Sequence, residues 1–179
     1  MNKKGFTLLE TLFALVIVST GFFSVFSLAQ TGIRATNASI NRLIAANLAQ
    51  EGVEIIRNIR DSVYVAGDDW NAVANPGHLD KHNCLTNHKN CRISIEPGSN
   101  QLLDEDNSAY LKIDANGKYS YSSGDNSIFR RWVNLTQGGG ICNQIATSTD
   151  CIEIDVTISW QEKGRNQDLE VEDYIYNWY

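Results

Sequence analysis

Residues 6–29 read FTLLETLFALVIVSTGFFSVFSLA, an almost unbroken run of apolar residues. Glu10 is the only charged residue between Lys4 and Arg34. As a helix, these 24 residues would be about 36 Å long, enough to cross the ~30 Å hydrocarbon core of a bilayer. The apolar run is longer than that of a cleaved secretory signal, and a helical pattern continues beyond it. We therefore predict a transmembrane helix.

The flanking charges predict the orientation of this helix. Lys3 and Lys4 precede the span and no cation directly follows it, which predicts a cytoplasmic N-terminus and export of everything after residue 29. Glu10 lies inside the apolar run, where an ionised carboxylate costs about 3 kcal/mol to insert. Position alone leaves two interpretations open. Glu10 is either a functional residue or a headgroup-level acid that suits the positive end of the helix dipole.

The pattern becomes amphipathic beyond residue 29, and it favours a continuation of the same helix. No proline interrupts residues 6–63, so one helix of about 85 Å is allowed. We predict that its second half packs one apolar stripe against a water-soluble head. Apolar residues recur near the helical period at Ile33, Ile40, Ile44, Leu48, Ile55, Ile56, Ile59 and Val63.

The rest of the chain has the patterns of loops and strands. Residues 66–90 are rich in Gly, Asp, Asn and His and are expected to form a long surface loop. The Asn116-Gly117 pair predicts a hairpin turn. Alternating apolar residues in 152–160 predict a strand with one face towards the helix. The expected class is α+β, a long helix on an antiparallel sheet, with strands at 92–96, 109–114, 118–122, 128–136, 152–161 and 169–178.

Composition limits the class of function. The chain has 179 residues, about one domain, and a net charge of −6 from 15 Lys and Arg against 21 Asp and Glu. A hydrophobic content of 42% excludes a disordered chain. The acidic balance also argues against nucleic-acid binding through a broad basic surface.

The segment 3–12, KKGFTLLETL, resembles the N-terminal processing motif of type IV pilins and type II secretion pseudopilins. In that family a prepilin peptidase cuts after the glycine of a short basic leader, and the new N-terminal phenylalanine is methylated. The resemblance implies cleavage between Gly5 and Phe6, with Phe6 as the mature terminus. It also implies that Glu10 pairs with the terminal amine of a neighbouring subunit during assembly. In any other axial register between neighbouring helices, Glu10 would be a buried charge without a partner, which is costly. Glu10 is therefore interpreted as an assembly residue.

Parts of the predicted head are similar to minor pilins. The similarity is looser and covers residues 110–121, 129–131, 156–160 and 174–178. Together the two resemblances imply a pilin-like lollipop with four parts: a leader at 1–5, a transmembrane and filament-core half-helix at 6–29, an amphipathic half-helix at 30–63, and a β-rich head at 64–179.

The function implied is that of a structural subunit of a type IV pilus-like filament. The implied partners are copies or relatives of the chain, the prepilin peptidase, an assembly platform, and membrane lipid before assembly. The precursor would reside in the bacterial cytoplasmic membrane and the assembled chain in a cell-surface filament. Two alternatives stay open, a secretion pseudopilin and a membrane-tethered binding domain that never polymerises.

Four cysteines allow three disulfide pairings. Because the cysteines lie on the exported side, where thiols oxidise, and fall into two close pairs, we predict Cys84–Cys91 and Cys142–Cys151. A zinc site is the alternative for the first pair, with His78, His82, Cys84, His88 and Cys91 as ligands. Its spacing matches no common zinc module, so we expect no metal and no cofactor.

No ordered set of catalytic residues is found. The sequence lacks Gly-x-Ser-x-Gly and His-Glu-x-x-His, and all three histidines fall in one loop. The acidic groups at 104–106 and at Asp114 do not follow an EF-hand pattern and are typical of turns. We therefore expect a protein that is not an enzyme.

Overall fold

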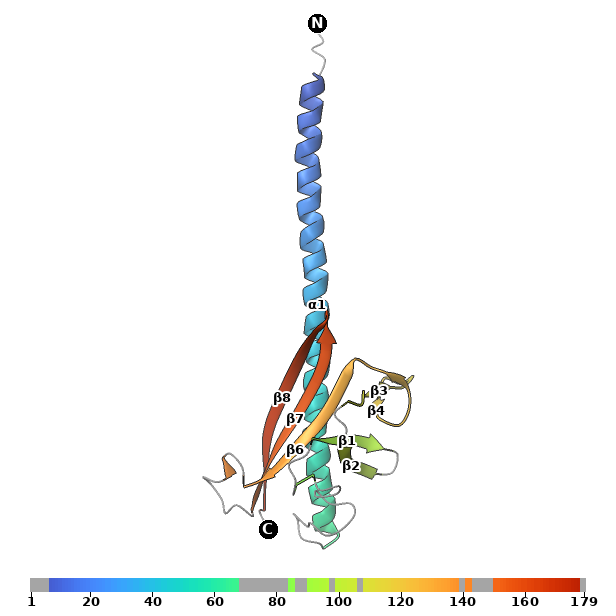
Figure 1. The fold of residues 1–179 in the computed structure, drawn as a ribbon, viewed down its shortest axis with the longest axis vertical. Coiled ribbons are helices and arrows are strands. Elements are labelled where there is room, and N and C mark those ends of the chain that lie inside the picture. The colour runs from blue at the N-terminus through green and yellow to red at the C-terminus, as the bar shows by residue number, and fades with distance from the viewer. Residues whose placement is uncertain are drawn as a thin grey trace. The chain divides into compact units, whose positions relative to one another are not determined.

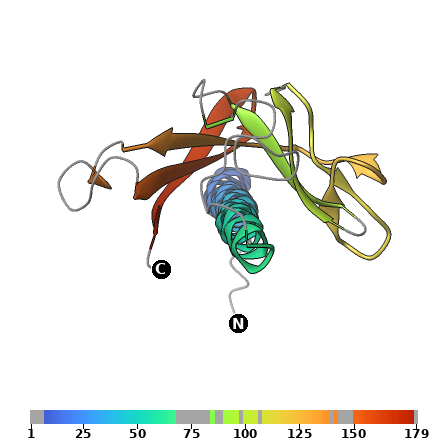
Figure 2. The same ribbon diagram turned by 90° about the horizontal axis from the view of Figure 1, so that it is seen from below.

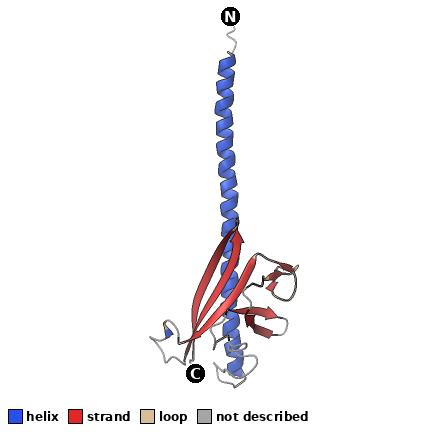
Figure 3. Cartoon of the chain, in the orientation of Figure 1, coloured by secondary structure: helices blue, strands red, loops and turns tan. Residues whose placement is uncertain are grey.

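A computed structural model of the chain describes residues 7–67, 84–85, 90–96, 99–105, 108–138, 141–142 and 150–177. One long helix, α1 (Leu8–Val65), comes first, and the strands follow it in the chain (Figure 1, Figure 3). Internal contacts divide the chain into two units, Met1–Asn41 and Arg42–Tyr179.

The predicted fold class is confirmed. The helix continues through Gly21, Gly32 and Gly52 without a break, as the absence of proline allows. The strands pair only in antiparallel fashion in the described residues. The molecule is therefore an α+β protein with one long N-terminal helix and antiparallel sheets, as expected for a pilin-like fold.

Two sheets make up the β structure. The larger has the order β2-β1-β6-β7-β8, and the smaller has the order β4-β3-β5. The Asn-Gly turn joins β3 to β4 as predicted, with Gly117 at φ 81° and the Gly117 amide donating to the Asp114 carbonyl at 3.0 Å. The strands are β1 (Cys91–Glu96), β2 (Ser99–Glu105), β3 (Lys112–Ile113), β4 (Tyr119–Ser120), β5 (Asp125–Asn126), β6 (Phe129–Gln137), β7 (Cys151–Glu162) and β8 (Arg165–Tyr176).

Strand prediction was accurate for the long strands and incomplete for the others. β1, β6 and β7 lie within one residue of their predicted bounds, whereas β8 begins four residues before its predicted start and ends two residues before its predicted end. The strands predicted at 109–114 and 118–122 are only two residues each, and β2 and β5 were not predicted. The sequence of β2, SNQLLDE, is polar and lacks apolar alternation, so nothing local marks it as a strand.

The core lies between the sheet and the helix residues of the second unit. β7 is buried on the face formed by its alternating apolar residues, as predicted. On the helix, burial begins at Ala45, whereas Ile33 and Ile40 are 57% and 48% exposed, so the buried stripe starts later than expected. Figure 2 shows the strands on one side of the part of α1 that belongs to the second unit. The buried cluster includes Leu48, Ile55, Ile56 and Ile59 of α1, Ile93 of β1, Val133 and Leu135 of β6, and Ile154, Val156, Ile158 and Trp160 of β7.

Gly52 allows α1 to approach β7 closely. A Cβ atom at this position would lie 2.8 Å from Cγ1 of Val156 and 3.3 Å from its Cγ2. Val156 is completely buried and has little room to move. The Gly52 residue, which costs the helix about 1 kcal/mol relative to alanine, is thus required by packing.

Arg131 joins three elements of the core. Its side chain is only 1% exposed. Nη1 donates to the Leu48 carbonyl at 3.0 Å and to Oε2 of Glu51 at 2.7 Å, and Nη2 donates to the Ile93 carbonyl at 2.8 Å. A single guanidinium on β6 therefore bonds both α1 and β1.

Gly52→Ala is predicted to destabilise the head. Overpacking a filled core costs about 1–3 kcal/mol, which exceeds the gain in helix propensity of about 1 kcal/mol. Gly32→Ala is the matched control, because a Cβ at Gly32 meets nothing within 4 Å. Urea unfolding of the full chain in detergent, followed by tryptophan fluorescence, measures both. Equal stability of the two variants would contradict the packing argument.

Arg131→Met is predicted to cost roughly 3–5 kcal/mol of unfolding free energy, because it leaves the Ile93 carbonyl and the Glu51 carboxylate without their partner. Arg130→Met is the control one residue earlier on β6, where the guanidinium is partly exposed against Tyr110 and should contribute less than about 1 kcal/mol. The same urea titration compares them. A larger loss for Arg130→Met would refute the assignment.

Candidate functional site

The first unit is an apolar helix with no internal cover. The large apolar side chains from Leu8 to Leu28 are between 54% and 79% exposed. An 18-residue window of α1 has a mean hydropathy of 2.2 and none of it is buried. By length and composition this helix is able to cross a membrane. Such a continuous apolar surface needs lipid or other helices around it.

Hydroxyl groups along this helix are bonded within it. Thr11, Ser19 and Thr20 donate to carbonyls three residues earlier, at 2.8 to 2.9 Å. Ser24 and Thr31 donate to carbonyls four residues earlier. Each of these five hydroxyl groups therefore donates a hydrogen bond within the helix. This makes the helix surface compatible with a water-poor environment.

Glu10 lies in the first turn of α1. Its backbone amide donates to Oγ1 of Thr7 at 3.3 Å, which makes Thr7 the N-cap and Glu10 the N3 residue of a Thr-x-x-Glu capping pattern. A negative side chain at N3 also interacts favourably with the helix dipole. Glu10 is exposed, and its side chain has no ion-pair partner among the described residues. Gly5 and Phe6, the predicted processing residues, lie outside the described residues.

Both predicted disulfides are present in the structure. Cys84 is bonded to Cys91 and Cys142 to Cys151, with sequence separations of 7 and 9 residues. Cys91 and Cys151 are the first residues of β1 and β7, so each bridge fixes the start of a strand. The oxidised sulfurs are not thiolate ligands, which removes two of the five groups of the zinc alternative. His78, His82 and His88 lie outside the described residues.

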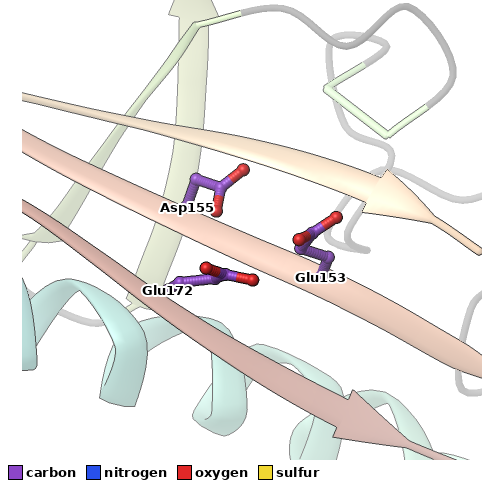
Figure 4. Close-up of side chains that lie close together, drawn as sticks. All are labelled: Glu153, Asp155 and Glu172. Carbon is purple, nitrogen blue, oxygen red and sulfur yellow. The ribbon is translucent and has the colours of Figure 1, made fainter. Parts of the chain in front are cut away.

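Three carboxylates meet on the outer face of the β7–β8 hairpin, a cluster that the sequence analysis missed. Glu153 and Asp155 of β7 and Glu172 of β8 each place an oxygen within 4.8 Å of the others (Figure 4). Register explains the cluster, because Asp155 pairs with Glu172 and Glu153 pairs with Tyr174. The Tyr174 hydroxyl contacts a carboxylate oxygen of both Glu153 and Glu172. The acids at alternate positions of each strand were visible in the sequence, but their pairing was not.

Proximity changes the acidity of these groups. Partial burial and a hydrogen bond with Glu172 raise the pKa of Glu153, although the Tyr174 hydroxyl acts in the opposite direction. Partial burial, with the negative charges of Glu170 and Glu172, raises the pKa of Asp155. The hydrogen bond to Glu172 raises the pKa of Tyr174. The face is therefore a site of like-charge repulsion at neutral pH.

Asp114 has a local role in the β3–β4 turn. Its Oδ1 accepts hydrogen bonds from the amides of Asn116 and Lys118, both at 2.9 Å. The Lys118 backbone hydrogen bond lowers the pKa of Asp114. The carboxylate thus stabilises the turn, as expected for an aspartate at this position.

Asp155→Asn is predicted to stabilise the protein at pH 7 more than at pH 4. A raised folded-state pKa means that the folded chain binds more protons than the unfolded chain, so stability falls as pH rises through the folded pKa. The gain in unfolding free energy should be below about 1 kcal/mol, because water screens this face. It should vanish as the pH falls to the pKa of an aspartate in the unfolded chain, about 4. Urea unfolding of the full chain in detergent at both pH values measures it.

Asp168→Asn serves as the control for this pH dependence. Asp168 lies on the same face of β8, opposite Ser159 and four residues from Glu172, or about 13 Å along the strand. The Asp168→Asn substitution removes one negative charge at a position outside the cluster. The change in unfolding free energy that it causes should therefore differ less between pH 7 and pH 4. A gain for Asp155→Asn that is larger at pH 4 would contradict the direction of the pKa shift.

Comparison with known proteins identifies the N-terminal segment. Residues 1–26 match the family model described as the prokaryotic N-terminal methylation motif. Searches of curated proteins and of solved structures found no match to the chain. The match stops before the head, so its similarity to minor pilins stays a prediction. The chain therefore carries, in front of an α+β head, the N-terminal methylation motif that is characteristic of type IV pilins and pseudopilins.

Proposed function

We propose that the chain is a structural subunit of a type IV pilus-like filament. A prepilin peptidase hydrolyses the Gly5–Phe6 bond, which leaves a carboxylate on the leader 1–5 and a free amine on Phe6, and a methyl group is then transferred to that amine. Residues 6–29 hold the precursor in the cytoplasmic membrane with the N-terminus inside. Residues 30–63 lead to the head at 64–179 on the outer side. The role is structural and needs no cofactor.

The observation that carries the proposal is the uncovered apolar helix. Thirteen large apolar side chains from Leu8 to Leu28 are more than half exposed. The hydroxyls of Thr11, Ser19, Thr20 and Ser24 between them are bonded within the helix. Lipid covers such a surface in the precursor. After extraction from the membrane, only apolar helices of other subunits can cover it at comparable free energy, because exposure to water costs about 25 cal/mol for each Å². Copies of the chain or related pilins supply these helices.

Glu10 sets the register of this helix bundle. Cleavage creates an amine on Phe6, four residues before the carboxylate and within the same apolar end of the chain. In a water-poor bundle, an amine and a carboxylate that each lack a partner cost several kcal/mol. Neighbouring helices therefore prefer the axial shift that pairs the amine of one subunit with Glu10 of the next. This pairing is compatible with the cap at Thr7, which uses the backbone amide of Glu10 and leaves its carboxylate available.

Glu10→Gln and Glu10→Ala are predicted to reduce filaments at least about tenfold, as expected when an unpaired buried amine costs several kcal/mol. Glutamine keeps the shape and the N3 position of Glu10 but removes its charge, so it separates charge pairing from capping. Sheared surface filaments are quantified by immunoblot and electron microscopy in a host that has a prepilin peptidase and a pilus assembly platform. Membrane levels and disulfide formation should stay normal.

Glu54→Gln provides the matched control. Glu54 is an exposed acid on the same helix, and its partner Arg57 keeps a second ion pair with Asp173 at 2.8 Å. Filament yield should not change in this variant. Normal filaments from Glu10→Gln would refute the charge pairing. A membrane-tethered domain that never polymerises predicts no filaments even from the wild-type chain, and a mature chain that keeps residues 1–5 would refute the proposed processing.

A further inference from the structure

The β7–β8 hairpin has opposite charges at its tip and along its body. At the tip, Lys163 and Arg165 flank Gly164 and are exposed, with Glu162 beside them. Neither cation has an ion pair within the part of the chain that the structure describes. The body presents five carboxylates on the outer face of the two strands, at Glu153, Asp155, Asp168, Glu170 and Glu172.

Strand register places these five carboxylates on one face. Asp155, Thr157 and Ser159 of β7 pair with Glu172, Glu170 and Asp168 of β8, and this outer row alternates with the buried row of Ile154, Val156 and Ile158. None of the five carboxylates has a cation partner among the described residues. The cation of β6 on this face, Arg130, lies opposite Ser159 and is engaged by Tyr110. The face therefore has strong negative charge without local compensation.

This charge pattern disfavours one kind of association and favours another. β8 is an edge strand of the large sheet. Two copies that paired along this edge by a two-fold axis would bring the same carboxylates together, which costs several kcal/mol. A head-to-tail contact instead brings the tip of one copy to the body of the next. Contacts of this heterologous type produce open helical assemblies when the rotation does not close.

We propose that this hairpin forms a contact between successive copies of the chain, in which Lys163 and Arg165 of one copy bind the carboxylate face of the next. The inference rests on the proposed filament and names one of its head contacts. Along β8, the carboxylates from Asp168 to Glu172 lie about 10 to 23 Å from Arg165. A shift between copies within this range places the tip over carboxylates. The occupant is a second copy because the same chain carries both complementary surfaces.

Charge reversal tests the contact in the full chain. The tip variant carries Lys163→Glu and Arg165→Glu, and the body variant carries Asp168→Lys and Glu170→Lys, which are exposed positions outside the Tyr174 cluster. Each alone should lower the yield of sheared filaments about tenfold or more, because like charges then face each other. A chain with all four changes restores opposite charges between the tip and residues 168 and 170, and it should recover filaments. Co-expression of the two variants should also give filaments that contain both.

Controls separate this inference from folding and from the proposed function. Lys163→Arg with Arg165→Lys keeps the charges and should assemble normally. Urea unfolding of every full-length variant in detergent should show that stability is retained. Normal filaments from the tip variant, or no recovery in the fourfold variant or the mixture, would overturn the contact while the filament stands. If the tip variant assembles and the body variant does not, the carboxylates face a different partner, and the inference is again wrong. Absence of filaments from the wild-type chain overturns both.

Discussion

The head depends on the close approach of α1 to the sheet, and two residues make that approach possible. Gly52 removes the side chain that would collide with Val156. Arg131 then supplies hydrogen bonds that this apolar contact lacks, because its guanidinium reaches the Leu48 carbonyl, Glu51 and the Ile93 carbonyl. A buried ion pair as a whole adds little net stability over apolar residues of equal size, although the loss of one partner alone is costly. The effect of Arg131 is selective, since any other placement of the helix on the sheet would leave a buried cation without partners.

Local signals predicted the parts of the fold that depend on local chemistry. The helix follows from its period and lack of proline, β7 from strict alternation, the β3–β4 turn from Asn116-Gly117, and both disulfides from short spacing. The parts that were missed depend on long-range pairing. β2 has no alternating pattern and exists because it pairs with β1. The roles of Gly52 and Arg131 are visible only when residues about 80 to 100 positions apart are brought together.

The candidate functional residues also divide into those that the local sequence indicates and those that depend on strand pairing. Glu10 was recognisable because a lone acid in an apolar run is a local anomaly, and it lies within the motif matched at residues 1–26. Its place in a Thr7-capped first turn was only partly anticipated, through the helix dipole. The carboxylate cluster of Glu153, Asp155 and Glu172 could not be predicted, because a shift of β8 by one residue would place Glu172 on the opposite face. The register between two strands decides which of their side chains become neighbours, and the sequence of one strand alone does not determine that register.

Apolar surface and charge have different tasks in this chain, and the structure separates them along the sequence. The helix of the first unit offers a large driving force for association but little direction, since apolar contact is nearly indifferent to rotation and axial shift. The outer face of the β7–β8 hairpin offers the reverse, because its carboxylates lie along an edge strand, where like charges disfavour pairing with an identical copy. Association through the helix alone would permit many registers. In the proposed filament, the charge at Glu10 and the opposite charges of the β7–β8 hairpin penalise most of these registers, so that one regular arrangement is favoured.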